Sequence, residues 1–118
     1  MKGLGELEAQ VMEILWSAES ALAVRQVLDA LPQDRNRAYT TVMTVLDNLH
    51  RKDFVHRERV GRAWHYRPAT SRDAHVAGLM SEALDTGGDR TAALVHFVEQ
   101  LPPEEAAELR ALLDRSRE

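Results

Sequence analysis

Hydroxyl side chains and arginines follow one another closely in the middle of this chain. Residues 38–52 (AYTTVMTVLDNLHRK) predict a helix, and residues 55–67 (VHRERVGRAWHYR) predict a basic β-hairpin. Threonine can donate a hydrogen bond to a phosphate or a base, and arginine binds phosphate oxygens through parallel hydrogen bonds. A slender helix followed by a cationic two-stranded ribbon can enter a DNA groove and hold the flanking phosphates. This stretch therefore predicts DNA binding.

The predicted helix has one apolar stripe, formed by Val42, Val45, Leu46 and Leu49, which we expect to be buried. The opposite face is polar, and its N-terminal half should enter the groove most deeply. No arginine lies at the centre of this face, so bidentate reading of guanine by the helix is not expected. Asp47 would repel phosphates unless it pairs with a base amine or a neighbouring arginine. The alternative interpretation is a solvated helix face without a ligand.

The arginines of the hairpin are expected to contact phosphates or the minor groove rather than to read bases. Gly61-Arg62 predicts the tight turn, so Arg59 and Arg62 should lie nearest the tip. Taken with the helix, the candidate DNA-binding residues are Arg37, Tyr39, Thr40, Thr41, Met43, Thr44, Arg51, Arg59 and Arg62.

The formal net charge of −4 argues against a nucleic-acid partner only until it is divided along the chain. Residues 35–72 carry nine basic and three acidic side chains, whereas residues 1–34 and 73–118 are acidic. Association with a polyanion depends on the local field more than on the global charge. The acidic parts should then face away from DNA. The alternative is that the basic composition of the middle third is coincidental.

The sequence gives little indication of disulfides, metal sites or catalytic groups. Without cysteine the chain can form no disulfide, no thiolate metal site and no cysteine nucleophile. His56 and His65 could face each other across the hairpin, but two imidazoles without a third ligand make a poor metal site. No Ser/His/Asp grouping, phosphate-cradling glycine loop or isolated carboxylate pair is found. We therefore expect no enzymatic activity, no metal and no cofactor.

The length of 118 residues, with 44% hydrophobic and 29% charged side chains, suits one globular domain or one small domain with an appendage. The first residues lack the apolar core of a signal peptide, and no apolar run approaches the roughly 18 residues of a membrane span. We expect a soluble, cytoplasmic protein that does not insert into a membrane.

Helical periodicity and turn signals predict the rest of the architecture. Predicted helices cover about residues 6–17, 24–31, 38–52, 72–84, 90–100 and 103 onward. The fold class is mainly α with a small two- or three-stranded β wing. Residues 1–69 are predicted to form a winged helix-turn-helix DNA-binding domain, and residues 70–118 a helical dimerisation domain.

The three helices after residue 70 carry more apolar surface than they can bury among themselves. Each leucine left in water forgoes about 1.5–3 kcal/mol of burial free energy. Dimerisation through this segment would cover them; the alternative is that the helices pack onto the winged domain. The candidate dimerisation residues are Val76, Leu79, Met80, Leu94, Phe97, Leu109 and Leu112.

Four segments in order resemble the penicillinase-repressor (BlaI/MecI-type) family of winged-helix transcriptional repressors. They are residues 7–16 (LEAQVMEILW), 38–46 (AYTTVMTVL), 61–68 (GRAWHYRP) and 93–99 (ALVHFVE). The resemblance implies a homodimeric repressor that binds a palindromic operator in double-stranded DNA and dimerises through its C-terminal helices. It also implies a pathway in which a membrane sensor leads to proteolysis of the repressor. The bond that corresponds to the family's cleavage site is His96–Phe97.

Three positions depart from the family's pattern. The family's well-studied members have asparagine where His96 stands. Ala23 replaces the usual hydroxyl cap of the second helix, which costs about 1 kcal/mol. Asp53 stands where a glycine usually follows the third helix. The copper-responsive branch of the family, which has a cysteine-rich tail, is excluded because this chain has no cysteine.

Two other functions compete with a dimeric repressor. A sequence-tolerant DNA-architectural protein is compatible with a recognition helix that has no central arginine. A winged-helix protein–protein adaptor would show no salt-dependent DNA binding. Specific binding should exceed binding to random DNA by at least about 10³-fold at physiological salt, which separates these alternatives.

Overall fold

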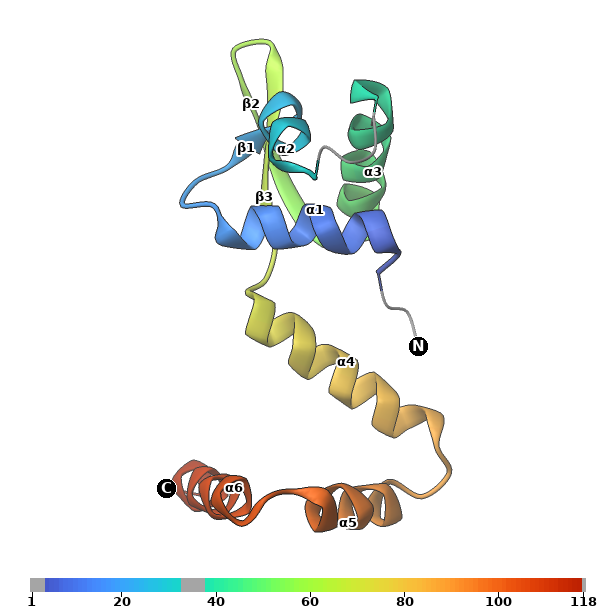
Figure 1. Cartoon of the computed structure of the whole chain (residues 1–118), viewed down its shortest axis with the longest axis vertical. Coiled ribbons are helices and arrows are strands. Elements are labelled where there is room, and N and C mark those ends of the chain that lie inside the picture. The colour runs from blue at the N-terminus through green and yellow to red at the C-terminus, as the bar shows by residue number, and fades with distance from the viewer. Residues whose placement is uncertain (1–3, 33–37, 118) are drawn as a thin grey trace. The chain divides into compact units, whose positions relative to one another are not determined.

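The computed structural model describes residues 4–32 and 38–117. The elements, in chain order, are α1 (Glu6–Ser17), β1 (Leu22–Ala23), α2 (Val24–Ala30), α3 (Tyr39–Arg51), β2 (Val55–Val60), β3 (Ala63–Pro68), α4 (Arg72–Thr86), α5 (Arg90–Gln100) and α6 (Pro103–Ser116) (Figure 1). The chain divides into two compact units, one extending to Gly78 and the other beginning at Leu79. The first unit is a winged helix: three helices and a three-stranded antiparallel sheet, as the predicted fold class states. No helix in the described ranges is long and apolar enough to span a membrane.

The core of the winged unit comes from the apolar stripes of its three helices and from two strand residues. The predicted stripe of α3 is confirmed, since Val42, Leu46 and Leu49 are fully buried and Val45 packs against them. The buried residues are Val11, Met12, Leu15, Val24, Val27, Leu31, Val42, Leu46, Leu49, Val55 and Tyr66. This arrangement leaves the polar face of α3 on the outside of the unit.

Helix α1 begins with a reciprocal contact rather than a hydroxyl cap. The Glu8 carboxylate accepts a hydrogen bond from the backbone N–H of Gly5 at 3.0 Å, and Lys52 Nζ lies 2.9 Å from its other oxygen. The backbone bond, and then the bond from Lys52, lower the pKa of Glu8 below its ordinary value. Glu8 therefore ties the start of α1 to the end of α3.

The third strand, β1, was not marked by any alternation in the sequence, although the predicted wing allowed two or three strands. Leu22 and Ala23 pair with Tyr66 and His65 of β3, and the sheet order is β1-β3-β2. Ala23 also occupies the N-cap of α2 without a side-chain cap, while the Gln26 side chain accepts from the backbone N–H of Ala23 at 2.8 Å. The contact with Gln26 thus partly compensates for the hydroxyl cap that Ala23 lacks.

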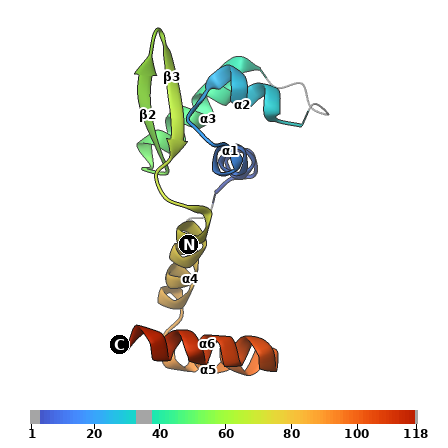
Figure 2. The ribbon, with the colours of Figure 1, turned by 90° about the vertical axis from the view of Figure 1, so that its left-hand side faces the viewer.

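Strands β2 and β3 form a long ribbon that projects beyond the helices of the winged unit (Figure 2). The predicted turn is confirmed, because Gly61 has φ +65°, a conformation that favours glycine. The register pairs His56 with Arg67 and Glu58 with His65. The two histidines are therefore not directly opposite each other, which corrects that expectation.

The turn between α3 and β2 places Asp53 in the left-handed region, at φ 66°. Its backbone N–H donates to the His50 carbonyl at 3.1 Å, and the N–H of Phe54 donates to the Leu49 carbonyl at 2.9 Å. This is the Schellman pattern of helix ends, in which glycine is the usual residue because it lacks a Cβ. The geometry explains why a glycine suits this position and shows that an aspartate stands there under backbone strain.

The first turns of α4 belong to the winged unit. Ser71 caps the helix by accepting from the N–H of Ala74 at 3.1 Å, and Arg72 forms a bidentate ion pair with Glu13 of α1. Trp16 is half-buried, and its indole N–H donates to the Thr70 carbonyl at 2.9 Å. These contacts anchor the start of α4 to α1.

His75, one turn further along α4, completes this anchor. Its ring centroid lies 5.3 Å from that of Trp16 and 5.6 Å from that of Phe54. The three rings come from α4, α1 and the segment before β2, so the aromatic contact joins three parts of the same unit.

The second unit is entirely helical and follows the predicted boundaries closely. Asp89 caps α5 by accepting from the N–H of Ala92 at 3.0 Å, and Pro103 opens α6 with Glu104 and Glu105 in its first turn. None of the described residues in α4, α5 or α6 is buried. Helices of this length gain most of their stability from packing, so this unit presents an apolar surface without a cover.

Candidate nucleic-acid interface

The outward face of α3 carries five of the six helix residues predicted to contact DNA; the sixth, Arg51, is at the end of the helix. All of them are exposed, and Tyr39 and Met43 keep 45% and 43% of their surface accessible. The exposed residues are Tyr39, Thr40, Thr41, Met43 and Thr44. The buried stripe on the other side fixes the rotation of the helix. The hydroxyl, thioether and phenol groups are thereby presented together.

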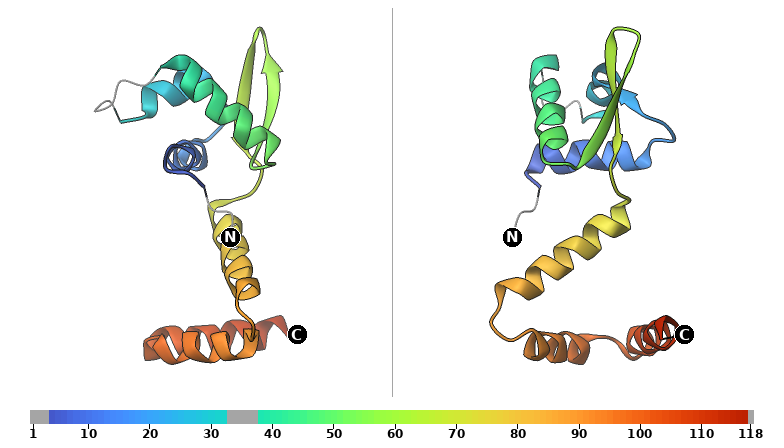
Figure 3. Two further views of the ribbon diagram at one scale, coloured as in Figure 1. Left: turned by 90° about the vertical axis from the view of Figure 1, so that its right-hand side faces the viewer. Right: turned by 180° about the vertical axis from the view of Figure 1, so that it is seen from behind.

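The ribbon of β2 and β3 lies beside α3 within the winged unit (Figure 3). A hollow of about 280 Å³ separates them, and it is lined by Met43, Thr44, Asp47, Arg57, Trp64 and Tyr66. The inner face of the ribbon is therefore continuous with the outward face of α3. This pair of surfaces is the candidate interface.

Asp47 joins the helix to the ribbon. One of its carboxylate oxygens lies 3.4 Å from Arg57 Nη1 of β2, and the other lies 3.2 Å from Arg51 Nη2. Asn48 Oδ1 accepts a further bond from Arg51 at 2.6 Å. The carboxylate is thus compensated by neighbouring arginines, one of the two conditions under which the sequence could tolerate it on a DNA-facing helix.

Trp64 carries two guanidinium groups over its ring. Arg57 Cζ lies 4.3 Å from the ring centroid and Arg59 Cζ lies 5.0 Å from it. The register explains this, because Arg59 is directly opposite Trp64 and Arg57 is opposite Tyr66, on the same face. Such contacts between a guanidinium and an indole ring stabilise an exposed pair by about 0.5–1 kcal/mol.

The remaining predicted residues differ in their surroundings. Arg37 lies outside the described residues. Arg62 is exposed in the turn at the tip of the ribbon, whereas Arg51 is exposed but shared between Asp47 and Asn48. Trp64 and Arg57 belong to the candidate interface but were not among the predicted DNA-binding residues. The alternation of the two strands places them on the same face and could have indicated them.

Tyr39 has a partner that the sequence did not indicate. Arg25 of α2 places its guanidinium carbon 5.9 Å from the centre of the tyrosine ring. This contact joins the first residue of α3 to the preceding helix. It thus adds a cation near the N-terminal end of the candidate interface.

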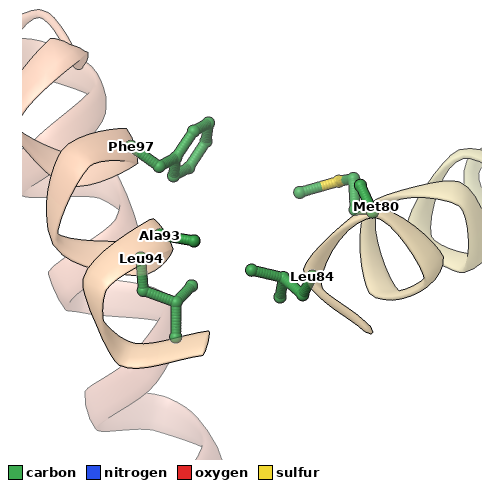
Figure 4. A pocket seen from close by; sticks show the side chains of 6 residues that line it. Met80, Leu84, Ala93, Leu94 and Phe97 are labelled. Atoms are coloured by element: carbon green, nitrogen blue, oxygen red, sulfur yellow. The ribbon is translucent and has the colours of Figure 1, made fainter. Parts of the chain in front are cut away.

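The second unit contains a groove between α4 and α5 that brings three predicted dimerisation residues together. Met80 of α4 lines one side of it, and Leu94 and Phe97 of α5 line the other (Figure 4). Its other lining residues are Ala83, Leu84 and Ala93, and its volume is about 280 Å³. Of the remaining candidates, Val76 and Leu112 are exposed, while Leu79 and Leu109 are half-buried.

Within the described ranges, no group of three or more histidine, aspartate or glutamate side chains could hold a metal ion. The candidate interface presents arginine, hydroxyl, thioether, carboxylate and aromatic side chains.

Comparison with known proteins assigns the chain to a family. The sequence profile described as "Penicillinase repressor" matches residues 4–115. The chain belongs to the penicillinase-repressor family. The transcriptional regulator BlaI of Mycobacterium tuberculosis is 50% identical over 113 residues, which cover 93% of this chain and 82% of that protein. This member of the penicillinase-repressor family is therefore a transcriptional regulator of the BlaI type, which is not an enzymatic role.

Solved structures support the winged-helix fold of this penicillinase-repressor family member. MepR, a transcription regulator of the Staphylococcus aureus multidrug efflux pump MepA, superposes with a TM-score of 0.53 at 22% identity over 96% of this chain and 77% of its own. A MarR family protein from Bacillus stearothermophilus superposes with a TM-score of 0.52 at 16% identity over 98% and 74% of the two chains. A variant of MepR bound to an oligodeoxyribonucleotide gives a TM-score of 0.52 at 20% identity, over 96% and 77%.

Proposed function

We propose that this protein is a homodimeric transcriptional repressor that binds a palindromic operator in double-stranded DNA. Helix α3 enters the major groove, and the ribbon of β2 and β3 contacts the flanking phosphates. Residues 1–69 form the DNA-binding domain, and residues 70–118 form the dimerisation domain. The protein acts in the cytoplasm, where a bacterial operator is accessible.

One observation carries the proposal: the exposed polar face of α3 and the arginine-bearing face of the ribbon border the same hollow. A helix and a cationic ribbon side by side can contact base edges and phosphates in the same docking step. The oligodeoxyribonucleotide bound by the MepR variant, which has this fold, supports the same use of the fold here.

The direct base contacts come from side chains of modest specificity. Threonine hydroxyls donate to or accept from several bases, and the methyl groups of Thr40, Thr41 and Met43 suit the methyl group of thymine. Since no arginine lies in the centre of the helix, we expect thymine-rich half-sites whose affinity comes largely from phosphate contacts.

Dimerisation supplies the affinity that one such domain lacks. Once one winged unit is bound, the second binds at a high effective concentration, so two weak half-sites yield one strong site. The uncovered apolar side chains of α4, α5 and α6 support a second copy as the cover.

Repression would then be relieved by damage to the C-terminal helices. The His96–Phe97 bond lies within α5, and cutting it separates α6 and the last turn of α5 from the DNA-binding part. A membrane sensor that activates a protease is the pathway that family membership supports. Mass spectrometry of the protein from induced cells tests this, because cleavage at this bond yields fragments that end at His96 and begin at Phe97.

The central experiment selects genomic DNA fragments with the intact protein and then competes the selected duplex against random DNA at physiological salt. A preference of at least about 10³-fold, with two symmetric half-sites, agrees with a specific dimeric repressor. Equal binding of both DNAs would instead favour an architectural protein, and no salt-dependent binding at all would favour a protein–protein adaptor. Sedimentation of the protein alone measures the dimer independently of DNA.

A further inference from the structure

The inner face of the ribbon, which carries Arg57, Arg59 and Trp64, contains an arrangement that its charge alone does not explain. Two arginines share the ring of Trp64, but only one of them also contacts a carboxylate. Arg57 is half-buried and paired with Asp47, whereas Arg59 is exposed and pairs with no carboxylate in the described part of the chain. The two cations therefore have different tasks.

We infer that Trp64 is a positioning residue that holds the Arg59 guanidinium in place for a DNA phosphate. This inference rests on the proposed function. The ring is rigidly placed, since Trp64 packs against the buried core and lies directly opposite Arg59 in the ribbon. A guanidinium held over an aromatic ring loses little freedom when it binds phosphate, because its position is already restricted.

The ion pair between Arg57 and Asp47 supports this arrangement. Two arginines that are two residues apart on one strand face repel each other, and the carboxylate of Asp47 offsets the charge of Arg57 from the side of α3. The Arg59 guanidinium is then the cation of the pair that remains available to DNA. Trp64 thus converts one of two adjacent arginines into a preorganised phosphate ligand.

The test is a double-mutant cycle between Trp64 and Arg59. The probe is a labelled random-sequence duplex of about 30 base pairs, long enough for two half-sites. Trp64→Leu should weaken binding about two- to fivefold in the natural background, and Trp64→Phe, which keeps a ring, should lose less. In an Arg59→Gln background the Trp64→Leu loss should disappear.

Arg67 provides the matched control, because it belongs to the same ribbon but lies on the opposite face, across from His56. In an Arg67→Gln background the Trp64→Leu loss should persist unchanged. Equal losses in the Arg59→Gln and Arg67→Gln backgrounds, or a Phe variant as weak as the Leu variant, would overturn the inference. If the unmodified protein shows no salt-dependent binding at all, both the proposed function and this inference fail. If it binds DNA but Trp64 and Arg59 show no coupling, only the inference fails.

A spectroscopic measurement keeps the inference testable if Trp64→Leu does not fold. The chain has two tryptophans, so Trp16→Phe leaves Trp64 as the single indole reporter. Random duplex DNA should change the fluorescence of Trp64, and Arg59→Gln should remove that change while Arg67→Gln retains it. A DNA-induced change that is the same with and without Arg59 contradicts the positioning role.

Discussion

Asp47 on α3 and Arg57 on β2 form an ion pair in which Oδ1 and Nη1 are 3.4 Å apart. This pair joins the helix that we propose enters the groove to the ribbon that we propose follows the backbone. Since Asp47 also contacts Arg51, one carboxylate restrains two cations on the candidate interface.

Replacing Asp47 by asparagine should increase affinity for random DNA about three- to tenfold, because a phosphate-repelling charge is removed and two arginines are released. Stability should change by less than about 1 kcal/mol, since Asp47 keeps 45% of its side-chain surface accessible and ion pairs near the surface contribute little. Fluorescence anisotropy with random duplex DNA measures the affinity. Glu58→Gln, on the outer face of the ribbon, is the control and should have a smaller effect. Weaker binding by Asp47→Asn would show that the carboxylate reads a base or orients the wing.

Replacing Arg62 by alanine at the tip of the ribbon should weaken binding to all sequences alike. It should also lower the slope of log affinity against log salt by about one unit, as expected for one lost phosphate contact. Titrations at several salt concentrations with selected and random duplexes measure both quantities. An altered sequence preference with an unchanged slope would mean that the wing reads bases.

Replacing Asp53 by glycine should stabilise the winged unit by about 1 kcal/mol, because glycine adopts φ 66° without a clash between its side chain and the backbone. Urea unfolding measures this change. Asp53→Val should destabilise the unit, since a β-branched side chain is strained in this region. DNA affinity should be unaffected by the glycine variant. An Asp53→Gly variant that is less stable would indicate that the carboxylate makes a stabilising contact that outweighs the strain.

Replacing Glu8 by glutamine should lower stability at neutral pH by about 1 kcal/mol, because the amide loses the charge that attracts Lys52 and the Gly5 N–H. The folded-state pKa of Glu8 lies below its ordinary value. Its contribution is therefore complete above the ordinary carboxylate pKa and is lost as the pH falls through the lower, folded value. Unfolding free energies of both proteins should converge in acid. Parallel pH profiles would exclude Glu8 as the source of this acid sensitivity.

Replacing Leu94 by glutamate should abolish the proposed dimer and lower affinity for the selected operator by orders of magnitude, since the avidity of two half-sites is lost. The side chain is 44% exposed and lies outside the buried core of the winged unit, so this unit should remain folded in the variant. Sedimentation and DNA titration are measured on the same sample. His96→Glu adds a charge at an exposed position that does not line the groove, and this variant should remain dimeric. Operator binding that survives in a monomeric Leu94→Glu protein would disprove the role of dimerisation.

Much of the fold follows from local signals in the sequence. The apolar stripe of α3, the turn at Gly61 and the cap at Asp89 were all readable, because each is determined by neighbouring residues. Strand β1 was not, since two residues carry no periodicity and form a strand only because Tyr66 and His65 offer a free edge. Local pattern therefore defined the elements but not every pairing.

In the candidate interface, too, local pattern predicts some features and tertiary contacts decide others. Exposure of Thr40 and Thr44 follows from the helix period alone. The separate roles of Arg57 and Arg59 do not, because Asp47 approaches only Arg57 and does so from another element. The arginines share one charge and look alike in the sequence, whereas tertiary contacts decide which of them is available to a phosphate.

The helices of the second unit contain no buried residue in their described parts, so a second copy would have to provide most of the free energy that keeps them folded. For the homodimer that we propose, the number of competent repressors would fall faster than the number of chains. When total protein is scarce, halving it would leave about a quarter of the pairs, because assembly depends on the square of the subunit concentration. Modest dilution or degradation would then suffice to turn a silent gene on.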